Sequence, residues 1–89
     1  LARFTARARK EGIVLDARTQ ALYDAHRFWI NGDTFEPSGT LLAWLSALAD
    51  ARRVSGASID AAAGLPDLMD TLHAWYEEGW LRLAGPAQR

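Results

Sequence analysis

The chain has 89 residues, of which 49% are hydrophobic and 24% charged, the composition of a folded globular domain. At this length folding buries only about 60–65% of the surface that the unfolded chain exposes, which allows a single small core. The absence of cysteine excludes disulfides, cysteine nucleophiles and thiolate metal sites. The formal net charge of −1 gives no overall attraction to nucleic acid or to an acidic membrane.

The first twelve residues predict the end of a helix. Alanine recurs in this segment, Leu1 and Phe4 share one face, and Gly12 suits the position after a helix end. The chain also opens with Leu1 rather than Met, and it contains no apolar run long enough to span a membrane. We therefore expect residues 1–12 to be the end of an upstream helical region of a longer protein.

The next segment predicts a hairpin. Residues 18–23 alternate imperfectly between polar and apolar side chains, which favours a strand after the apolar run Ile13-Val14-Leu15. The partner strand is predicted over residues 26–30, with Trp29 facing away from its two apolar neighbours. The tripeptide Asn31-Gly32-Asp33 then predicts a tight turn, because Asn and Gly adopt positive φ at little cost.

Three helices are predicted after the hairpin. Ser38 or Thr40 can cap the first, which should run to about Arg52 because its apolar residues recur at i, i+3, i+4 and i+7. An extended link containing Val54 follows it. Ser58 is predicted to cap a short second helix that ends near Gly64.

The third helix is predicted over residues 65–78, with Pro66 in its first turn and a wide apolar stripe along one side. Residues 80–83 alternate as a closing strand. A hairpin, three helices and a closing strand form the layout of a winged helix. We therefore expect an α+β fold, a small winged-helix domain over residues 13–85, followed by a frayed tail at residues 86–89.

The sequence contains no recognisable catalytic or metal-binding motif. Its only histidines are His26 and His73, and neither has the neighbours that an iron or zinc site uses. The serines form no nucleophile elbow, and the glycines form no phosphate-binding loop. We therefore expect this chain alone to be no enzyme, with no catalytic, cofactor-binding or metal-binding residue.

Tryptophan is frequent for so short a chain. Trp44 and Trp75 lie on apolar stripes and are expected in the core, and Trp80 is expected to hold the last strand against the helices. Trp29 lies on the opposite face of its strand from the apolar side chains. It is therefore a candidate interface residue.

Charge is divided unevenly along the chain. Residues 1–27 carry six basic and three acidic side chains, a net +3, whereas residues 28–89 carry four basic and eight acidic ones, a net −4. The helix predicted over residues 65–78 contains no Lys or Arg, although a DNA-reading helix needs them against phosphates. We therefore do not expect nucleic acid to bind there. The acidic side chains expected at an interface instead are Asp67, Asp70, Glu77 and Glu78.

Three segments resemble, in order and spacing, the C-terminal winged-helix domain of bacterial JmjC-type cupin oxygenases, the ribosomal oxygenases. They are Phe28-Trp29-Ile30-Asn31-Gly32-Asp33, with Asp33 where Glu is commoner, Leu48-Ala49-Asp50-Ala51-Arg52, and Trp75-Tyr76-Glu77-Glu78-Gly79-Trp80-Leu81. The resemblance covers residues 13–84. It implies a cytoplasmic parent with a catalytic cupin barrel, a helical dimerisation region and a winged helix at its C-terminus.

Such a parent would be an Fe(II)- and 2-oxoglutarate-dependent hydroxylase of a ribosomal-protein arginine, with its iron and 2-oxoglutarate ligands in the barrel. No ligand residue is therefore carried over to this chain. The resemblance implies a non-catalytic accessory module that aids substrate presentation or assembly. Its implied partners are the upstream catalytic and dimerisation domains of the same protein and a basic ribosomal protein. We expect no contact with a membrane.

The sequence leaves two other functions open. One is a winged-helix domain that binds nucleic acid, for which affinity for duplex DNA at low salt is the distinguishing measurement. The other is a stand-alone protein–protein interaction or dimerisation domain, for which sedimentation over a range of concentrations would reveal self-association.

Overall fold

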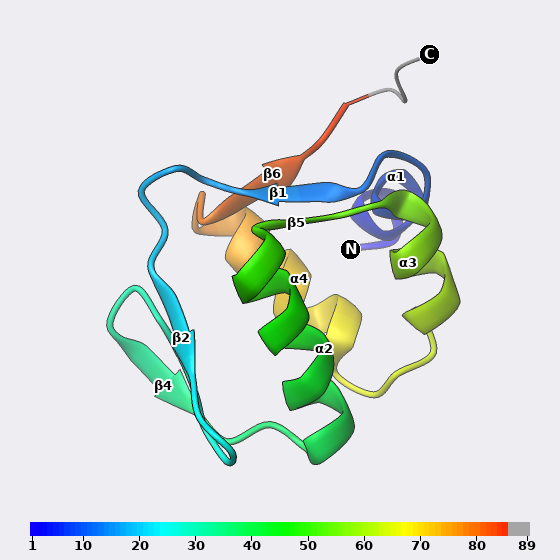
Figure 1. Cartoon of the computed structure of the whole chain (residues 1–89). Helices are drawn as coiled ribbons and strands as arrows, with labels where there is room; N and C mark the ends of the chain where they lie inside the picture. Colours follow the sequence, from blue (N-terminus) through cyan, green and yellow to red (C-terminus); the bar gives the residue numbers. More distant parts are fainter. Residues whose placement is uncertain (86–89) are drawn as a thin grey trace.

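The computed structural model describes residues 1–85, which form four helices and two three-stranded antiparallel sheets (Figure 1). The helices are α1 (Ala2–Glu11), α2 (Gly39–Ala51), α3 (Gly56–Ala62) and α4 (Leu68–Glu77). The strands are β1 (Ile13–Leu15), β2 (Ala21–Tyr23), β3 (Phe28–Ile30), β4 (Asp33–Phe35), β5 (Arg53–Val54) and β6 (Leu81–Leu83). The predicted α+β class is confirmed. None of the helices in this part of the chain has the length and hydropathy needed to cross a membrane.

The first sheet has the strand order β5-β1-β6, so β1 is its central strand. Ile13 pairs with Val54 on one side and with Leu83 on the other. The segment at Val54, predicted as an extended link, is therefore a strand of this sheet. Because β1 precedes the second sheet and all the later helices in sequence, it connects the start of the chain to segments near its middle and end.

α1 packs onto the rest of the domain through one face. Phe4 and Ala8, one turn apart, are both buried, and α1 lies against α3 and α4. Gly12 ends the helix with a φ of 79°, as its predicted position indicates. Residues 1–12 thus contribute to the same core as the winged helix. The domain boundary predicted at residue 12 stays a prediction, and the tail predicted at residues 86–89 lies outside the described residues.

Two glycines allow the end of α1 and the start of α3 to meet backbone to backbone. A Cβ added to Gly12 would collide with the carbonyl oxygen of Val54. A Cβ added to Gly56 would lie 2.5 Å from the carbonyl oxygen of Lys10. Real Cβ atoms do not come so close to backbone atoms. Both positions therefore require glycine for the backbones to lie this close together.

The second sheet, β2-β3-β4, has the predicted tight turn and the predicted alternation. Asn31 and Gly32 adopt φ values of 47° and 92°, as a two-residue hairpin turn requires. Phe28 and Ile30 are each 1% exposed on the inner face of β3, whereas Trp29 faces outward. Alternation along β3 therefore determines which side of the sheet covers the core.

β2 and β3 are shorter than predicted because their ends are held by side-chain hydrogen bonds. Oδ1 of Asp24 accepts hydrogen bonds from the amides of His26 and Arg27, both at 2.8 Å, which makes a turn of residues expected in the strand. Thr19 also lies outside the strand, and its buried hydroxyl donates to the carbonyl oxygen of Trp80 at 2.7 Å. This bond ties the loop before β2 to the start of β6.

The first helix of the predicted three is largely as expected. Ser38 caps α2, because its Oγ accepts a hydrogen bond from the amide of Leu41 at 3.3 Å, whereas Thr40 lies within the helix. The helix ends at Ala51, and Arg52 follows in the left-handed conformation with φ 64°. Arg52 then donates to the carbonyl oxygens of two residues in the loop after β1.

The other two helices start at positions different from those predicted. The assignment of Ser58 as a cap is wrong, because Ser55 is the capping residue and its Oγ accepts from the amide of Ser58 at 3.1 Å. Ser55 follows β5 in an extended conformation, which leaves its side chain free to reach forward. α4 starts at Leu68 rather than at residue 65, because Asp67 has a φ of 68° and cannot lie inside a right-handed helix.

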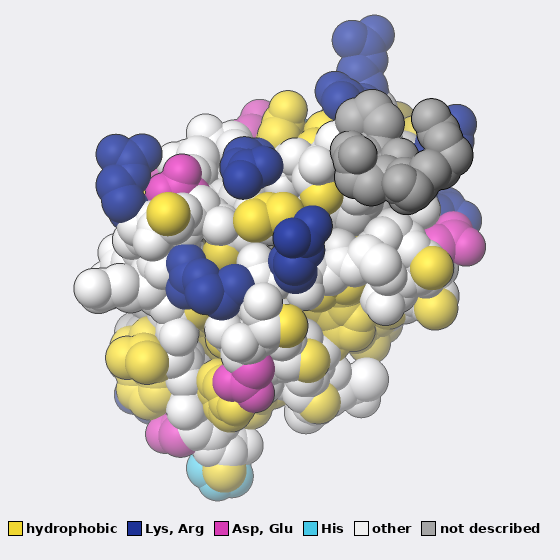
Figure 2. Space-filling view, turned by 45° about the horizontal axis from the view of Figure 1, so that its top comes forward, with side chains coloured by type: hydrophobic (Ala, Val, Ile, Leu, Met, Phe, Trp, Pro, Cys, Tyr) yellow, Lys and Arg dark blue, Asp and Glu magenta, His cyan; other side chains and the backbone are white. Residues whose placement is uncertain are grey.

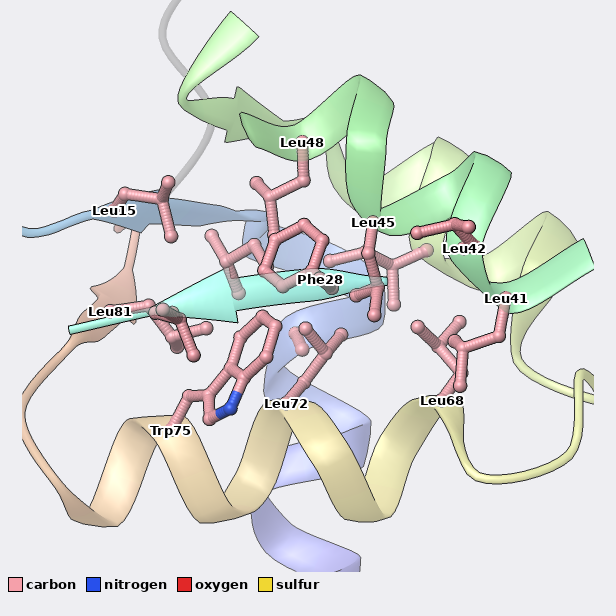
Figure 3. Close-up of a cluster of buried hydrophobic side chains, with 14 of the residues drawn as sticks. Leu15, Phe28, Leu41, Leu42, Leu45, Leu48, Leu68, Leu72, Trp75 and Leu81 are labelled. Atoms are coloured by element: carbon pink, nitrogen blue, oxygen red, sulfur yellow. The ribbon is translucent and has the colours of Figure 1, made fainter. Parts of the chain in front are cut away.

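A single core lies between α2, α4 and the inner faces of the strands (Figure 3). Phe28 of β3 stacks on Trp75 of α4 with ring centroids 5.6 Å apart and an interplanar angle of 19°. Leucines of both helices surround this pair; those labelled in Figure 3 are Leu41, Leu42, Leu45, Leu48, Leu68 and Leu72. Trp44 and Trp80, expected in or against the core, are partly buried at its edge.

Substituting Gly56→Ala should destabilise the domain by about 1–3 kcal/mol, because the new methyl group meets backbone atoms of α1 rather than a mobile side chain. A drop in Tm on the order of 10 °C is expected. The matched control is Gly39→Ala at the start of α2, where nothing lies within 4 Å of the added carbon. Equal Tm values for the two variants would contradict the backbone contact.

The capping residue of α3 can be tested with two serine variants. Ser55→Ala should cost about 1 kcal/mol in the free energy of unfolding, because the amide of Ser58 loses its acceptor. Ser58→Ala should cost less than about 0.5 kcal/mol, as expected for an exposed helical position. Urea denaturation of both variants measures the difference, and the reverse order would restore Ser58 as the cap.

Candidate protein-interaction site

The four acidic residues predicted at an interface are all exposed, but they do not form one cluster. Asp67 immediately precedes α4 and Asp70 lies in its first turn, whereas Glu77 and Glu78 lie at its other end. A helix of ten residues is about 15 Å long. The structure therefore separates the set into two pairs, one at each end of α4.

The pair at the start of α4 lines an open groove of about 460 Å³, which we call the acidic groove. The linker between β4 and α2 forms its other side. Its main residues are Phe35, Glu36, Leu41, Asp67, Asp70 and Ala74. Neither Asp67 nor Asp70 forms an ion pair with any of residues 1–85. Carboxylates beside apolar surface suit a long basic side chain, whose stem covers the apolar part while its charged end reaches the rim.

Glu36 is the residue of this groove that the sequence did not single out. It lies after β4, far from α4 in sequence, and no motif connects it with Asp67. Its carboxylate accepts from the guanidinium of Arg27 at 2.9 Å, with the two side chains 65% and 46% exposed. An ion pair this exposed contributes at most about 1 kcal/mol. The free negative charge of the groove therefore comes mainly from the two aspartates.

Arg27 connects the acidic groove with the outer face of the second sheet. Its guanidinium carbon lies 5.9 Å from the centroid of the Trp29 ring, within the range of a cation–π contact. The turn before it is held by Asp24, and the amides of His26 and Arg27 that bond this carboxylate keep its pKa below the usual value. These two hydrogen bonds hold the turn from which the Arg27 side chain extends.

Trp29 lies on the outer face of β3, as predicted, and is half-buried. Leu22 of β2 and Thr34 of β4 are its cross-strand partners, so the three side chains form a row that we call the outer-sheet row. Leu22 is 68% exposed. An open groove of about 500 Å³ runs along this side of β2 and β3, and Trp29 and Leu22 both line it. An apolar row of this kind is available to a protein partner, and the interface role of Trp29 stays a prediction.

The chain's own residues do not fit the iron site that the resemblance implies for the parent. His26 lies in the turn between β2 and β3, whereas His73 lies on α4 with its ring 5.4 Å from that of Phe4. Among residues 1–85 no three His, Asp or Glu side chains gather where they could hold a metal ion. We therefore derive no chemistry through Fe(II) or 2-oxoglutarate on this chain.

Comparison with known proteins identifies the family. A family model described as the ROXA-like winged helix matches residues 1–82, which is most of the chain and includes α1. No curated protein and no solved structure gives a significant match. The expected resemblance to the C-terminal winged helix of ribosomal oxygenases is confirmed, and the chain belongs to the ROXA-like winged-helix family.

Proposed function

We propose that this domain is the non-catalytic C-terminal accessory module of an Fe(II)- and 2-oxoglutarate-dependent ribosomal-protein arginine hydroxylase of the cytoplasm. Membership of the ROXA-like family supports its role as an accessory domain. The iron and 2-oxoglutarate would belong to the upstream catalytic domain. The finer proposal is a role in presenting a basic substrate. The observation that carries it is the acidic groove, whose Asp67 and Asp70 form no ion pair within residues 1–85.

A basic ribosomal protein would complement the acidic groove in charge. An arginine stem can pack on Phe35 and Ala74, and its guanidinium can reach Asp67 or Asp70. Exposed ion pairs contribute only about 0–1 kcal/mol each, so binding at this groove is weak. Its effect is to increase the rate of encounter and to orient the substrate, while the catalytic domain provides most of the affinity.

The same charges argue against α4 as a DNA-reading helix. α4 presents Asp70 and Glu77, and neither the helix nor its two flanking residues include Lys or Arg. Carboxylates repel phosphates, and affinity for nucleic acid depends on neutralising them. These charges favour a basic partner for this helix over a nucleic acid.

We also propose that the upstream domains of the parent cover the outer-sheet row. Leu22 exposes most of its side chain beside Trp29, and exposed apolar side chains grouped in this way are typical of contact surfaces. The same guanidinium of Arg27 contacts both the Trp29 ring and the carboxylate of Glu36, so the outer-sheet row and the acidic groove adjoin each other at this side chain.

Binding of a short arginine-rich peptide tests the acidic groove. The double variant Asp67→Asn, Asp70→Asn should bind about 10-fold more weakly at low salt, because two exposed charge pairs of up to about 1 kcal/mol each are removed. The matched control, Glu77→Gln, Glu78→Gln, removes two charges from the other end of α4 and should change affinity less than about 2-fold. Isothermal titration calorimetry gives both values, and equal losses would show general attraction rather than a site.

The outer-sheet row predicts a difference between the isolated chain and the parent protein. Leu22→Glu should change the free energy of unfolding of the isolated chain by less than about 0.5 kcal/mol, because this side chain is exposed. In the parent the same change should lower Tm, because it places a charge in an apolar contact. Ala43→Glu, on the exposed side of α2, is the control. An unchanged parent Tm would mean that the row is not covered there.

A further inference from the structure

The outer face of the first sheet carries an arginine row. In the register of this sheet Val14 of β1 pairs with Arg53 of β5 on one side and with Arg82 of β6 on the other. Ile13 and Leu15, the neighbours of Val14, point inward to the core, so these three side chains share the solvent face. Both arginines are exposed, and neither forms an ion pair with any residue that the structure describes.

The spacing of the arginine row follows from sheet geometry. Neighbouring strands are about 4.8 Å apart, so the Cα atoms of Arg53 and Arg82 are separated by roughly 10 Å. Their guanidinium groups carry the same charge, and neither forms an ion pair with any of residues 1–85. Figure 2 shows Lys and Arg side chains gathered across this face of the molecule. The side chains of Lys10 and Arg18, which lie just before and just after β1 in the chain, are exposed as well.

The acidic side chains near this face already have basic partners. Asp16 accepts hydrogen bonds from the backbone amide and the guanidinium of Arg18, and these bonds, together with the charge of Arg82, hold its pKa below the usual value. Glu11 pairs with Arg7 along α1. Asp16 thus interacts with the charge of Arg82 without forming an ion pair with it, and its hydrogen bonds go to Arg18 instead.

We propose that the arginine row binds the phosphodiester backbone of a nucleic acid without reading its bases. Arginine presents planar, bidentate donors that match phosphate oxygens. The small side chain of Val14 between the two arginines lets a backbone approach the sheet closely. No aromatic side chain lies in the row, so bases have no stacking surface there. This surface is independent of the proposed acidic groove, which has the opposite charge.

The test is fluorescence anisotropy of a short labelled RNA duplex with the 89-residue chain. We expect a Kd of about 10–100 µM at low salt and a slope of log K against log salt of about −2 to −4, as a few phosphate contacts give. Arg53→Gln, Arg82→Gln should weaken binding by about 10-fold or more and should make the slope shallower by about 2, one for each phosphate contact removed.

The control variant is Arg27→Gln, which removes an exposed arginine from the other sheet and should leave affinity and slope unchanged. Both arginines of the row are exposed, and thermal melts of each variant establish that it is folded. Absence of salt-dependent binding by the native chain would overturn the proposal. An equal loss in the Arg27 variant, or equally tight binding of poly-glutamate, would overturn it too, since either result means general attraction to anions.

Discussion

The position of β1 between β5 and β6 is the constraint on which the rest of this domain depends. Without this strand the two segments that flank α3 and α4 have no partner, because within residues 1–85 β5 and β6 each pair only with β1. The backbone contact at Gly12 and Gly56 then fixes α1 against α3. A strand from the start of the chain therefore completes the sheet that closes the winged helix, and it brings α1 into the core.

The same strand determines where charge collects on the surface. Residues 28–89 have an acidic balance, yet Arg53 and Arg82 belong to that part of the sequence. Pairing with β1 places both on one face, while three carboxylates of the same region, those of Glu36, Asp67 and Asp70, line the acidic groove. The domain thus has two surfaces of opposite sign, although its net charge is close to zero. Average charge along a segment does not reveal such a division, because strand register decides it.

Features set by local chemistry could be predicted from the sequence. The Asn31-Gly32 turn, the alternation around Trp29 and the periodicity of α2 all depend on residues a few positions apart, and all are present. Helix starts were less predictable. Ser55 and Ser58 are equally good caps by type, and only the extended strand before Ser55 selects between them. Glu36 was missed because its place beside Asp67 depends on the packing of two distant segments.

The acidic character of α4 is not explained by helix stability alone. Asp70 lies near the positive end of the helix dipole, where a carboxylate is favourable, but Glu77 lies at the negative end, where it is not. His73 is 3.8 Å from Glu77 and can offset that charge only when it is protonated. Both ends of the helix therefore repel phosphate. If this winged helix contacts nucleic acid, the contact has to be made by a surface of opposite sign, and the arginine row across β5, β1 and β6 is the surface that we propose for it.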